Sequence, residues 1–324
     1  MSAPTTDRSP GLNASPPPAF SHEALIYEGD PDFLTGTVPF VQEGVDNGEA
    51  VLVVVDAAKI ARLRAALGSD ADRVQFADMN DIGLNPARII PAWQDFVAEH
   101  GRSGRPFRGI GEPIFAARTA DQLIECQRHE SLLNVAFAGS GPWRLLCPYD
   151  VTSLSPLVLE EAHRSHPFVL GRGLPEPSAD YRGLEASGAP FDVALPEPPS
   201  SALLLPIAAD SLGEVRVVVT DHAVQAGLRI DDAQDLALAA HEIAANSARY
   251  GGGGGELRSW SAEAGVVCEV RDGGHINAPL AGRERPPTSK TGGRGLWLAN
   301  HLCDLVQIRT LTTGGVVRLH KFWS

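Results

Sequence analysis

The 324-residue chain has few cysteines, fewer basic than acidic residues, and no long apolar run. Its four cysteines lie far apart without C-x-x-C spacing, which favours buried free thiols over disulfides or a zinc knuckle. No apolar run reaches the roughly 18 residues of a membrane span. The N-terminus lacks the basic-then-apolar pattern of a signal peptide. We therefore expect a cytoplasmic protein that does not cross or bind a membrane.

The shortage of basic residues also bears on partners. Lys and Arg number 27 against 40 Asp and Glu, so the formal net charge is −13 at pH 7. Such a chain is a poor candidate for the phosphate backbone of nucleic acid, and no local basic stripe compensates. The length suggests two domains, each with enough chain to bury a core.

Proline and glycine divide the chain. Residues 1–20 are proline-rich and have no hydrophobic period, so we predict that they are disordered. Residues 169–200 hold further prolines and several glycines, which predicts a semi-stiff linker. The predicted domains are therefore residues 21–168 and 201–324. A linker of this kind limits the distance between domains without fixing their orientation, so communication between them would need a docked interface. Two independent domains on a tether are the alternative.

The first domain alternates strand and helix patterns, which predicts a doubly wound parallel sheet. Its distinctive residues are His22, Tyr27, Glu28, residues 48–53, Glu112, Pro113, residues 128–130 and residues 147–150. With these residues the half resembles the MEDS sensory domain (methanogen/methylotroph, DcmR type), itself similar to the RecA/KaiC core. The resemblance implies a sensory pocket for a small-molecule ligand.

Two features of this half bear on ligands. A RecA-type ATPase would carry a P-loop after the first strand, but residues 28–32 here hold three acids and no lysine. Acids repel phosphate, so we expect no nucleotide in this half. His22, His129, Glu130 and Cys147 are of types that bind metals, yet they come from separate elements and their spacing is not diagnostic. Ordinary polar and core residues are the favoured interpretation.

The second domain is organised around residues 236–250, an Ala- and Leu-rich stretch that predicts a helix ended by five glycines. Glu242 and Asn246 lie four residues apart and share one face of this helix. Residues 266–272 then read as a strand that ends at Asp272 before two glycines. Finally, a glycine loop around Gly293 opens directly into an amphipathic helix, which aims free N–H groups at an anion.

These stretches together resemble the nucleotide-binding domain of the GHKL superfamily, and most closely the RsbW-type anti-sigma factor serine/threonine kinases. The resemblance covers residues 201–324 and implies a Bergerat α/β sandwich that binds ATP and Mg²⁺. The N box is matched by Glu242 and Asn246, and the D-x-G box by Asp272 and Gly274. The second glycine box is matched by Gly293, Arg294, Gly295 and Leu296.

The resemblance implies a role for each matching residue. Asn246 would hold the Mg²⁺ that bridges the phosphates, and Glu242 would be the general base. Asp272 would accept a hydrogen bond from the adenine amino group, with Gly274 allowing close approach. The second glycine box would hold the phosphates. Two departures weaken the case for turnover more than for binding: Val316 replaces the usual threonine, and the predicted lid, residues 277–291, is short.

We therefore expect a sensory domain that controls an ATP-binding, anti-sigma-factor-type kinase domain. It would phosphorylate or sequester an anti-anti-sigma-type protein, a sigma factor, or both. The alternative is a non-catalytic switch that acts by ATP-dependent binding only. A histidine sensor-kinase fragment is less favoured, because no phosphoacceptor-histidine helix precedes the ATP domain. The oligomeric state stays open, with a homodimer among the alternatives.

Overall fold

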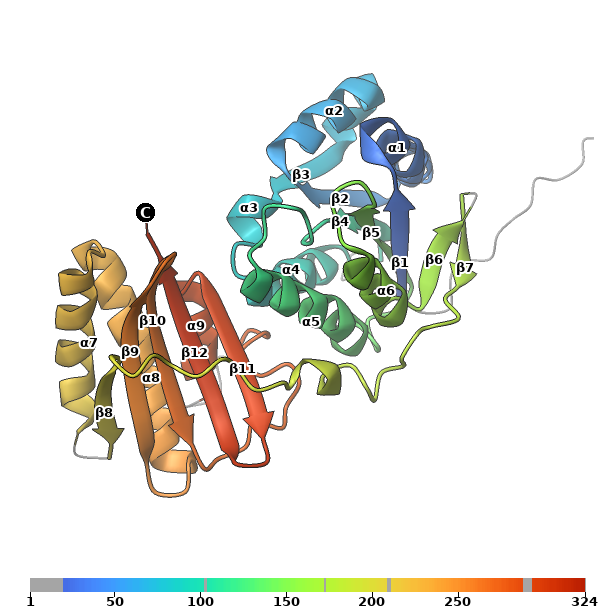
Figure 1. Cartoon of the computed structure of the whole chain (residues 1–324). Coiled ribbons are helices and arrows are strands. Elements are labelled where there is room, and N and C mark those ends of the chain that lie inside the picture. The colour runs from blue at the N-terminus through green and yellow to red at the C-terminus, as the bar shows by residue number, and fades with distance from the viewer. Residues whose placement is uncertain (1–19, 102–103, 172, 209–210, 288–292, 324) are drawn as a thin grey trace, which may run out of the picture.

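The computed structural model describes residues 20–101, 104–171, 173–208, 211–287 and 293–323. These residues form two lobes, each built on its own sheet (Figure 1). The predicted disorder of residues 1–20 falls outside the described residues, except for Phe20, which begins the first strand. Among the described helices, none is both long enough and apolar enough to cross a lipid bilayer.

The first lobe has a seven-stranded sheet in the order β3-β2-β4-β5-β1-β6-β7. All neighbouring strands are parallel except the β6–β7 hairpin, which is antiparallel. Residues 169–171 and 174–177, expected in the linker, thus continue this sheet. The strands are β1 (Phe20–Tyr27), β2 (Ala50–Val55), β3 (Val74–Asp78), β4 (Phe107–Gly111), β5 (Trp143–Asp150), β6 (Phe168–Gly171) and β7 (Leu174–Pro177).

Helices cover both faces of this sheet and enclose two apolar cores. Successive residues of a strand point to opposite faces, so Ala24 packs in one core and Leu25 in the other. The strands are therefore apolar on both sides, as predicted for a doubly wound sheet. The helices are α1 (Gly29–Asp46), α2 (Ala57–Leu67), α3 (Met79–Ile82), α4 (Ile89–Gly101), α5 (Ala120–Ala136) and α6 (Pro156–Ser165), with short 3₁₀ turns at Gly68–Arg73, Pro86–Arg88 and Ala189–Phe191.

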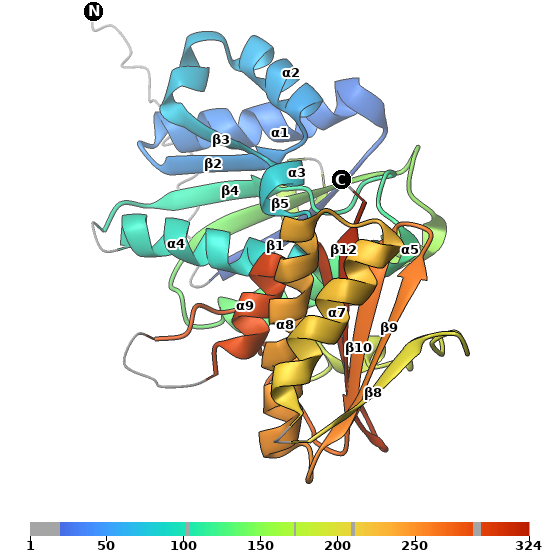
Figure 2. The same cartoon turned by 90° about the vertical axis from the view of Figure 1, so that its left-hand side faces the viewer.

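The second lobe has a five-stranded antiparallel sheet in the order β11-β12-β10-β9-β8. Helices α7, α8 and α9 lie on one face of it (Figure 2), where they enclose one core. The elements are β8 (Leu203–Ile207), α7 (Leu212–Ala226), α8 (Ile230–Tyr250), β9 (Gly255–Ala262), β10 (Gly265–Asp272), α9 (Gly295–Leu302), β11 (Leu305–Leu311) and β12 (Gly314–Phe322). The predicted fold class, a parallel α/β domain followed by a GHKL-type sandwich, is confirmed.

The open face of the second sheet is crossed by the segment that joins the lobes (Figure 1). Pro196 O accepts a hydrogen bond from Arg318 at 2.5 Å, and Val193 O accepts one from Arg309 at 3.1 Å. Arg318 is buried and pairs with the buried carboxylate of Glu269. The connecting segment is therefore anchored along the sheet for part of its length.

Candidate functional site

The site begins with helix α8, whose apolar face is pressed onto the second sheet. Alanine and leucine favour the helix, and residues such as Leu236, Ala240 and Ile243 bury that face. Glu242 and Asn246 lie one turn apart on the same side of this helix, and both are half-buried. The helix ends at Tyr250, before the glycines, as predicted.

The N-terminus of α9 lies directly against this strip. A Cβ atom built on Gly295 would lie 2.8 Å from Asn246 Nδ2 and 3.4 Å from the Cβ of Glu242. A larger residue would displace the Asn246 amide, so glycine lets this amide lie against the start of α9. The first N–H groups of α9 have no partner within the helix, and the helix dipole makes this end favourable for an anion.

Asp272 ends β10 inside a shell of glycines. Its Oδ1 accepts a hydrogen bond of 2.7 Å from the Gly274 N–H, which fixes the carboxylate. A Cβ on Gly251 would lie 2.7 Å from the Asp272 side chain. Gly314 has φ +130°, and a Cβ there would lie 2.0 Å from Asp272 O. The glycines thus leave the space around this carboxylate open.

A cavity of about 330 Å³ connects Asp272 with Asn246, near the lower end of the range for small-molecule pockets. Five of the eight predicted site residues line it: Asn246, Asp272, Gly274, Gly293 and Leu296. Glu242, Arg294 and Gly295 are not among its lining residues. Gly295 nevertheless packs against Glu242 and Asn246, and Arg294 immediately precedes it as the N-cap of α9.

Further lining residues were not singled out from the sequence. Ile243 and Tyr250 share a face of α8 with Asn246. Their helical spacing from Asn246 would have predicted that they line the same cavity. Gly315 and Val317 alternate along β12, so Val316, which replaces the family's usual threonine, points away from the cavity. Val270 of β10 and the loop after Asp272, residues 275–278, supply the rest.

The cavity suits a nucleotide by its chemistry. Apolar walls from Ile243, Val270 and Val317 can enclose an adenine ring. Asp272 offers one fixed carboxylate at the inner end. At the other end lie the amide of Asn246, a side chain of the type that ligates Mg²⁺, and the anion-binding start of α9. The residues present therefore fit ATP and Mg²⁺.

The described part of the predicted lid, residues 277–287, is held against the first lobe. Arg283 is only 5% exposed and donates to Glu125 Oε2 at 3.1 Å. Glu125 lies on α5 of the first lobe and also accepts from Arg309 of β11 at 2.7 Å. Burial lowers the pKa of Arg283 to about 10, although Glu125 opposes this shift. Most other side chains of this stretch are exposed, and residues 288–291 lie outside the described residues.

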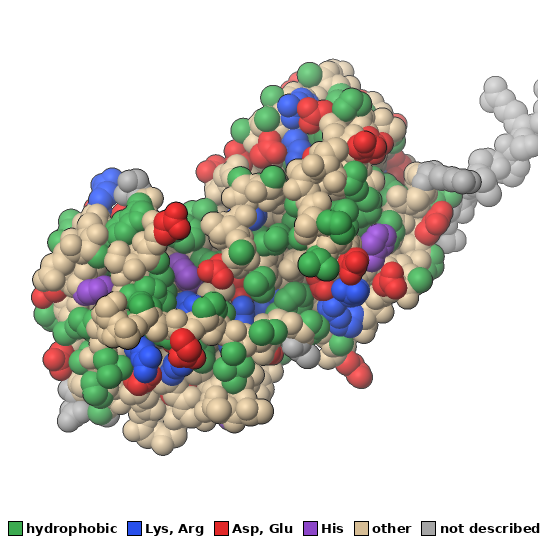
Figure 3. All heavy atoms as spheres, viewed as in Figure 1, with side chains coloured by type: hydrophobic (Ala, Val, Ile, Leu, Met, Phe, Trp, Pro, Cys, Tyr) green, Lys and Arg blue, Asp and Glu red, His purple; other side chains and the backbone are tan. Residues whose placement is uncertain are grey.

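A second set of contacts ties the lid, α9 and the first lobe together. Asn85 of the first lobe is buried and donates to Asn300 O at 3.0 Å and Cys303 O at 3.3 Å, at the end of α9. The Asn300 side chain in turn donates to Gly282 O of the lid at 2.9 Å. Leu280 packs against the core of the first lobe. The lobes are thus docked through the lid and the end of α9, and Figure 3 shows them in contact.

Comparison with known proteins gives two family matches. Residues 21–167 match the MEDS family, described as the methanogen/methylotroph, DcmR sensory domain. Residues 205–321 match the family of histidine kinase-like ATPase domains. No curated protein matches the chain.

A solved structure with local similarity to this chain contains the RsbU and RsbW domains of a protein from Mycobacterium tuberculosis. The two share 20% sequence identity with a TM-score of 0.29, over 38% of this chain and 33% of that one. The chain thus spans about a third of the length of that structure. The two family matches support a regulatory, ATP-binding signalling protein, and they fall where the sequence resemblances were drawn. The chain therefore joins a MEDS sensory domain to a histidine kinase-like ATPase domain.

Proposed function

We propose that the ATPase domain is an anti-sigma-factor-type serine/threonine kinase controlled by the MEDS domain. Its substrate would be an anti-anti-sigma-type protein, and it would also sequester a partner such as a sigma factor. One observation carries the proposal. The Gly295 backbone lies against Glu242 and Asn246 at one end of a cavity whose other end holds Asp272.

Each residue then has a chemical task. Asp272, held by the Gly274 N–H, would accept a hydrogen bond from the adenine amino group. The N–H groups of residues 293–296 would hold the phosphates at the start of α9. Asn246 would bind Mg²⁺ through its amide oxygen, and the bound ion would neutralise phosphate charge.

Glu242 would act as the general base. It lies one helical turn from Asn246 and is half buried, so its carboxylate stays close to the phosphate end of the cavity. A substrate serine brought to this position would give its hydroxyl proton to Glu242 as the oxygen attacks phosphorus. Since Glu242 is not a lining residue of the cavity, the substrate serine would reach it from outside the nucleotide cavity.

Control by the MEDS domain would act through the lid. Arg283 is paired with Glu125 across the lobes, and Gly282 is linked through Asn300 to Asn85. A ligand or partner that changes the position of α5 would thereby change how easily the lid opens over the cavity. By linkage, nucleotide binding would change the affinity of the MEDS domain for its ligand by the same factor.

The test uses the full chain, Mg²⁺ with γ-labelled ATP, and a small anti-anti-sigma-type protein as acceptor. Transfer should fall by about 10²-fold or more in Glu242→Gln, with nucleotide affinity little changed. Asn246→Ala should instead weaken binding of Mg·ATP in calorimetry. Glu263→Gln, an exposed glutamate far from the cavity, is the matched control and should behave as wild type. An unchanged transfer rate in Glu242→Gln would refute the assignment of the base.

The second candidate is a switch that binds ATP without turnover. The buried Arg283 favours it, because a lid held by the other lobe suits a binding surface that ATP stabilises. The same assay separates the two functions. Tight Mg·ATP binding together with ATP-dependent capture of the partner, but without label on it, identifies the switch.

A further inference from the structure

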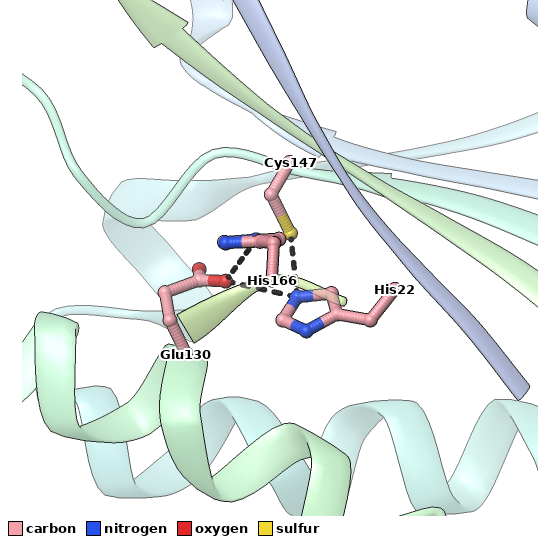
Figure 4. A group of neighbouring side chains, drawn as sticks. All are labelled: His22, Glu130, Cys147 and His166. Atoms are coloured by element: carbon pink, nitrogen blue, oxygen red, sulfur yellow. Dashed lines mark hydrogen bonds and ion pairs between the residues drawn. The ribbon is translucent and has the colours of Figure 1, made fainter. Parts of the chain in front are cut away.

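A group of buried polar side chains in the MEDS domain plays no part in the nucleotide site. Figure 4 shows His22, Glu130, Cys147 and His166 pointing at one another. His22 lies on β1, Cys147 on the neighbouring β5, Glu130 on α5, and His166 directly after α6. One nitrogen, oxygen or sulfur atom from each lies within 4.8 Å of the others, and all four residues are buried.

Three of these residues are of metal-binding types in the sequence, where ordinary polar and core residues are the favoured interpretation. The structure brings His22, Glu130 and Cys147 together but leaves out His129, whose Nδ1 has no hydrogen-bond partner. His166 completes the group and was missed, because it lies outside the matched motifs. Its proximity depends on the path of α6 back to the sheet.

The hydrogen bonds around the group fix the protonation of both imidazoles. The amide nitrogen of Asn134 donates to Ser165 O at 2.7 Å, so its oxygen faces His22 Nδ1 at 3.1 Å. His22 Nδ1 therefore carries its proton. His166 Nδ1 lies 2.8 Å from Ala162 O, a pure acceptor, and carries its proton as well. In the neutral rings, both Nε2 atoms are then left with a lone pair.

These two lone pairs converge on a carboxylate. His22 Nε2 lies 3.1 Å from Glu130 Oε2, and His166 Nε2 lies 3.2 Å from the same oxygen. The Sγ of Cys147 lies 3.3 Å from His22 Nε2. The other oxygen of Glu130 and His166 Nε2 have no hydrogen-bond partner of good geometry. Buried acceptors in such proximity are costly unless a proton or a cation lies among them.

We propose that the MEDS domain binds one divalent transition-metal ion, of the zinc class, through His22 Nε2, His166 Nε2, Cys147 Sγ and the Glu130 carboxylate. Metal–ligand bonds of about 2.0–2.3 Å give a tetrahedron with edges of about 3.3–3.6 Å. The three distances above are 3.1–3.3 Å, so these pairs need to separate by only a few tenths of an ångström. All pairs lie within 4.8 Å, so a remaining pair needs to close by about 1.5 Å at most.

The donor set selects the metal. Two imidazoles and a thiolate favour zinc and its first-row neighbours over Mg²⁺ or Ca²⁺, which prefer oxygen. Each imidazole is oriented by an oxygen acceptor on its other nitrogen, the outer-sphere arrangement usual for metal-bound histidine. Binding would release the thiol proton of Cys147. With four protein ligands and no open position, the ion would fasten β1, β5, α5 and the start of β6 together.

The alternative is a metal-free network in which Cys147 donates its S–H to His22 and Glu130 keeps a proton for His166. Elemental analysis of the untagged, dialysed full chain by mass spectrometry decides between the two. We expect about one equivalent of zinc, cobalt or iron(II) per chain. The chelator-treated chain should take Zn²⁺ back with a Kd tighter than about 100 nM in competition with a chromophoric chelator.

Variants identify the ligands. Cys147→Ser should weaken Zn²⁺ binding by about 100-fold or more, and the Co²⁺-loaded protein should lose its thiolate-to-metal absorption band. Cys126→Ser removes another buried thiol, which donates to Pro113 O outside the group, and should bind as wild type. Asn134→Ala removes the acceptor that orients His22, so the affinity for Zn²⁺ should fall by about 10- to 100-fold.

Two results would overturn the proposal. The first is a wild-type chain that holds less than about a tenth of an equivalent of metal and takes up no Zn²⁺ after chelator treatment. The other is a folded Cys147→Ser chain that binds the ion as tightly as Cys126→Ser. The wild-type measurement decides the matter even where a variant fails to fold. No part of the experiment depends on the proposed kinase function, because no nucleotide is present.

Discussion

Replacing Glu125 by alanine tests how the two domains are held together. Its carboxylate is 1% exposed and pairs with Arg283 of the lid at 3.1 Å and with Arg309 of β11 at 2.7 Å. A third buried arginine, Arg128, lies on α5 one turn after Glu125. The substitution leaves Arg283 and Arg309 buried without their carboxylate.

The cost follows from this burial. Removing one partner of a buried ion pair destabilises a protein by about 3–5 kcal/mol, because the remaining charge is left uncompensated. Here the lobes can relieve that cost by separating, which lets water reach the arginines. Most of the free energy should therefore be lost from docking, and the lid should be released from the first lobe.

Two assays on the full chain follow this release. Cleavage by trypsin within the lid, after Arg283, should become faster than in wild type. Affinity for Mg·ATP should change by about 5- to 150-fold, the range of a coupling free energy of about 1–3 kcal/mol. A rise or a fall in this affinity shows whether the docked lid favours the open or the closed form of the cavity.

The matched control is another ion pair between the lid and the first lobe. Asp95 and Arg285 lie 3.0 Å apart, but their side chains are 63% and 67% exposed. Exposed pairs contribute less than about 1 kcal/mol, so Asp95→Ala should change neither cleavage nor affinity appreciably. If Glu125→Ala had as small an effect as Asp95→Ala, the buried pair would not be what holds the lid.

Three other substitutions test separate parts of the structure. Gly314→Ala should destabilise the chain and weaken ATP binding, because its Cβ would clash with Asp272 O; calorimetry and thermal unfolding measure both. Asn85→Ala removes the buried donor to Asn300 O and should lower the free energy of unfolding by about 1–3 kcal/mol in urea titrations. Burial lowers the pKa of His320 to about 4, so the unfolded state binds more protons between pH 4 and 6.5. Stability should fall by up to about 3 kcal/mol on acidification through that window, and His320→Gln should flatten this slope.

Much of the fold and of the nucleotide cavity follows from local patterns in the sequence. The helix around Glu242 and the strand ending at Asp272 each depend on residues within a few positions, and glycines mark their ends. The β6–β7 hairpin was missed because Pro175 and Pro177 argue against a strand. An edge strand tolerates them, since its outer N–H groups need no partner.

The docked lid could not be predicted in the same way. Arg283 lies in a polar, proline-rich stretch, and nothing near it in sequence indicates that its partner is Glu125, 158 residues earlier. The same holds for His166, which meets His22 only because α6 returns the chain to the sheet. Contacts between distant segments depend on how whole elements pack, which local patterns do not encode.

Helix α5 has a consequence for engineering. Glu125 and Arg128 face the ATPase domain, whereas Glu130 and Asn134 face His22. The helix therefore serves the contact between the domains and the buried group around His22 at once, and the two domains are not interchangeable modules. A chimera that takes this MEDS domain to another output domain must also take the arginines at 283 and 309, or replace Glu125 and Arg128 with residues suited to water.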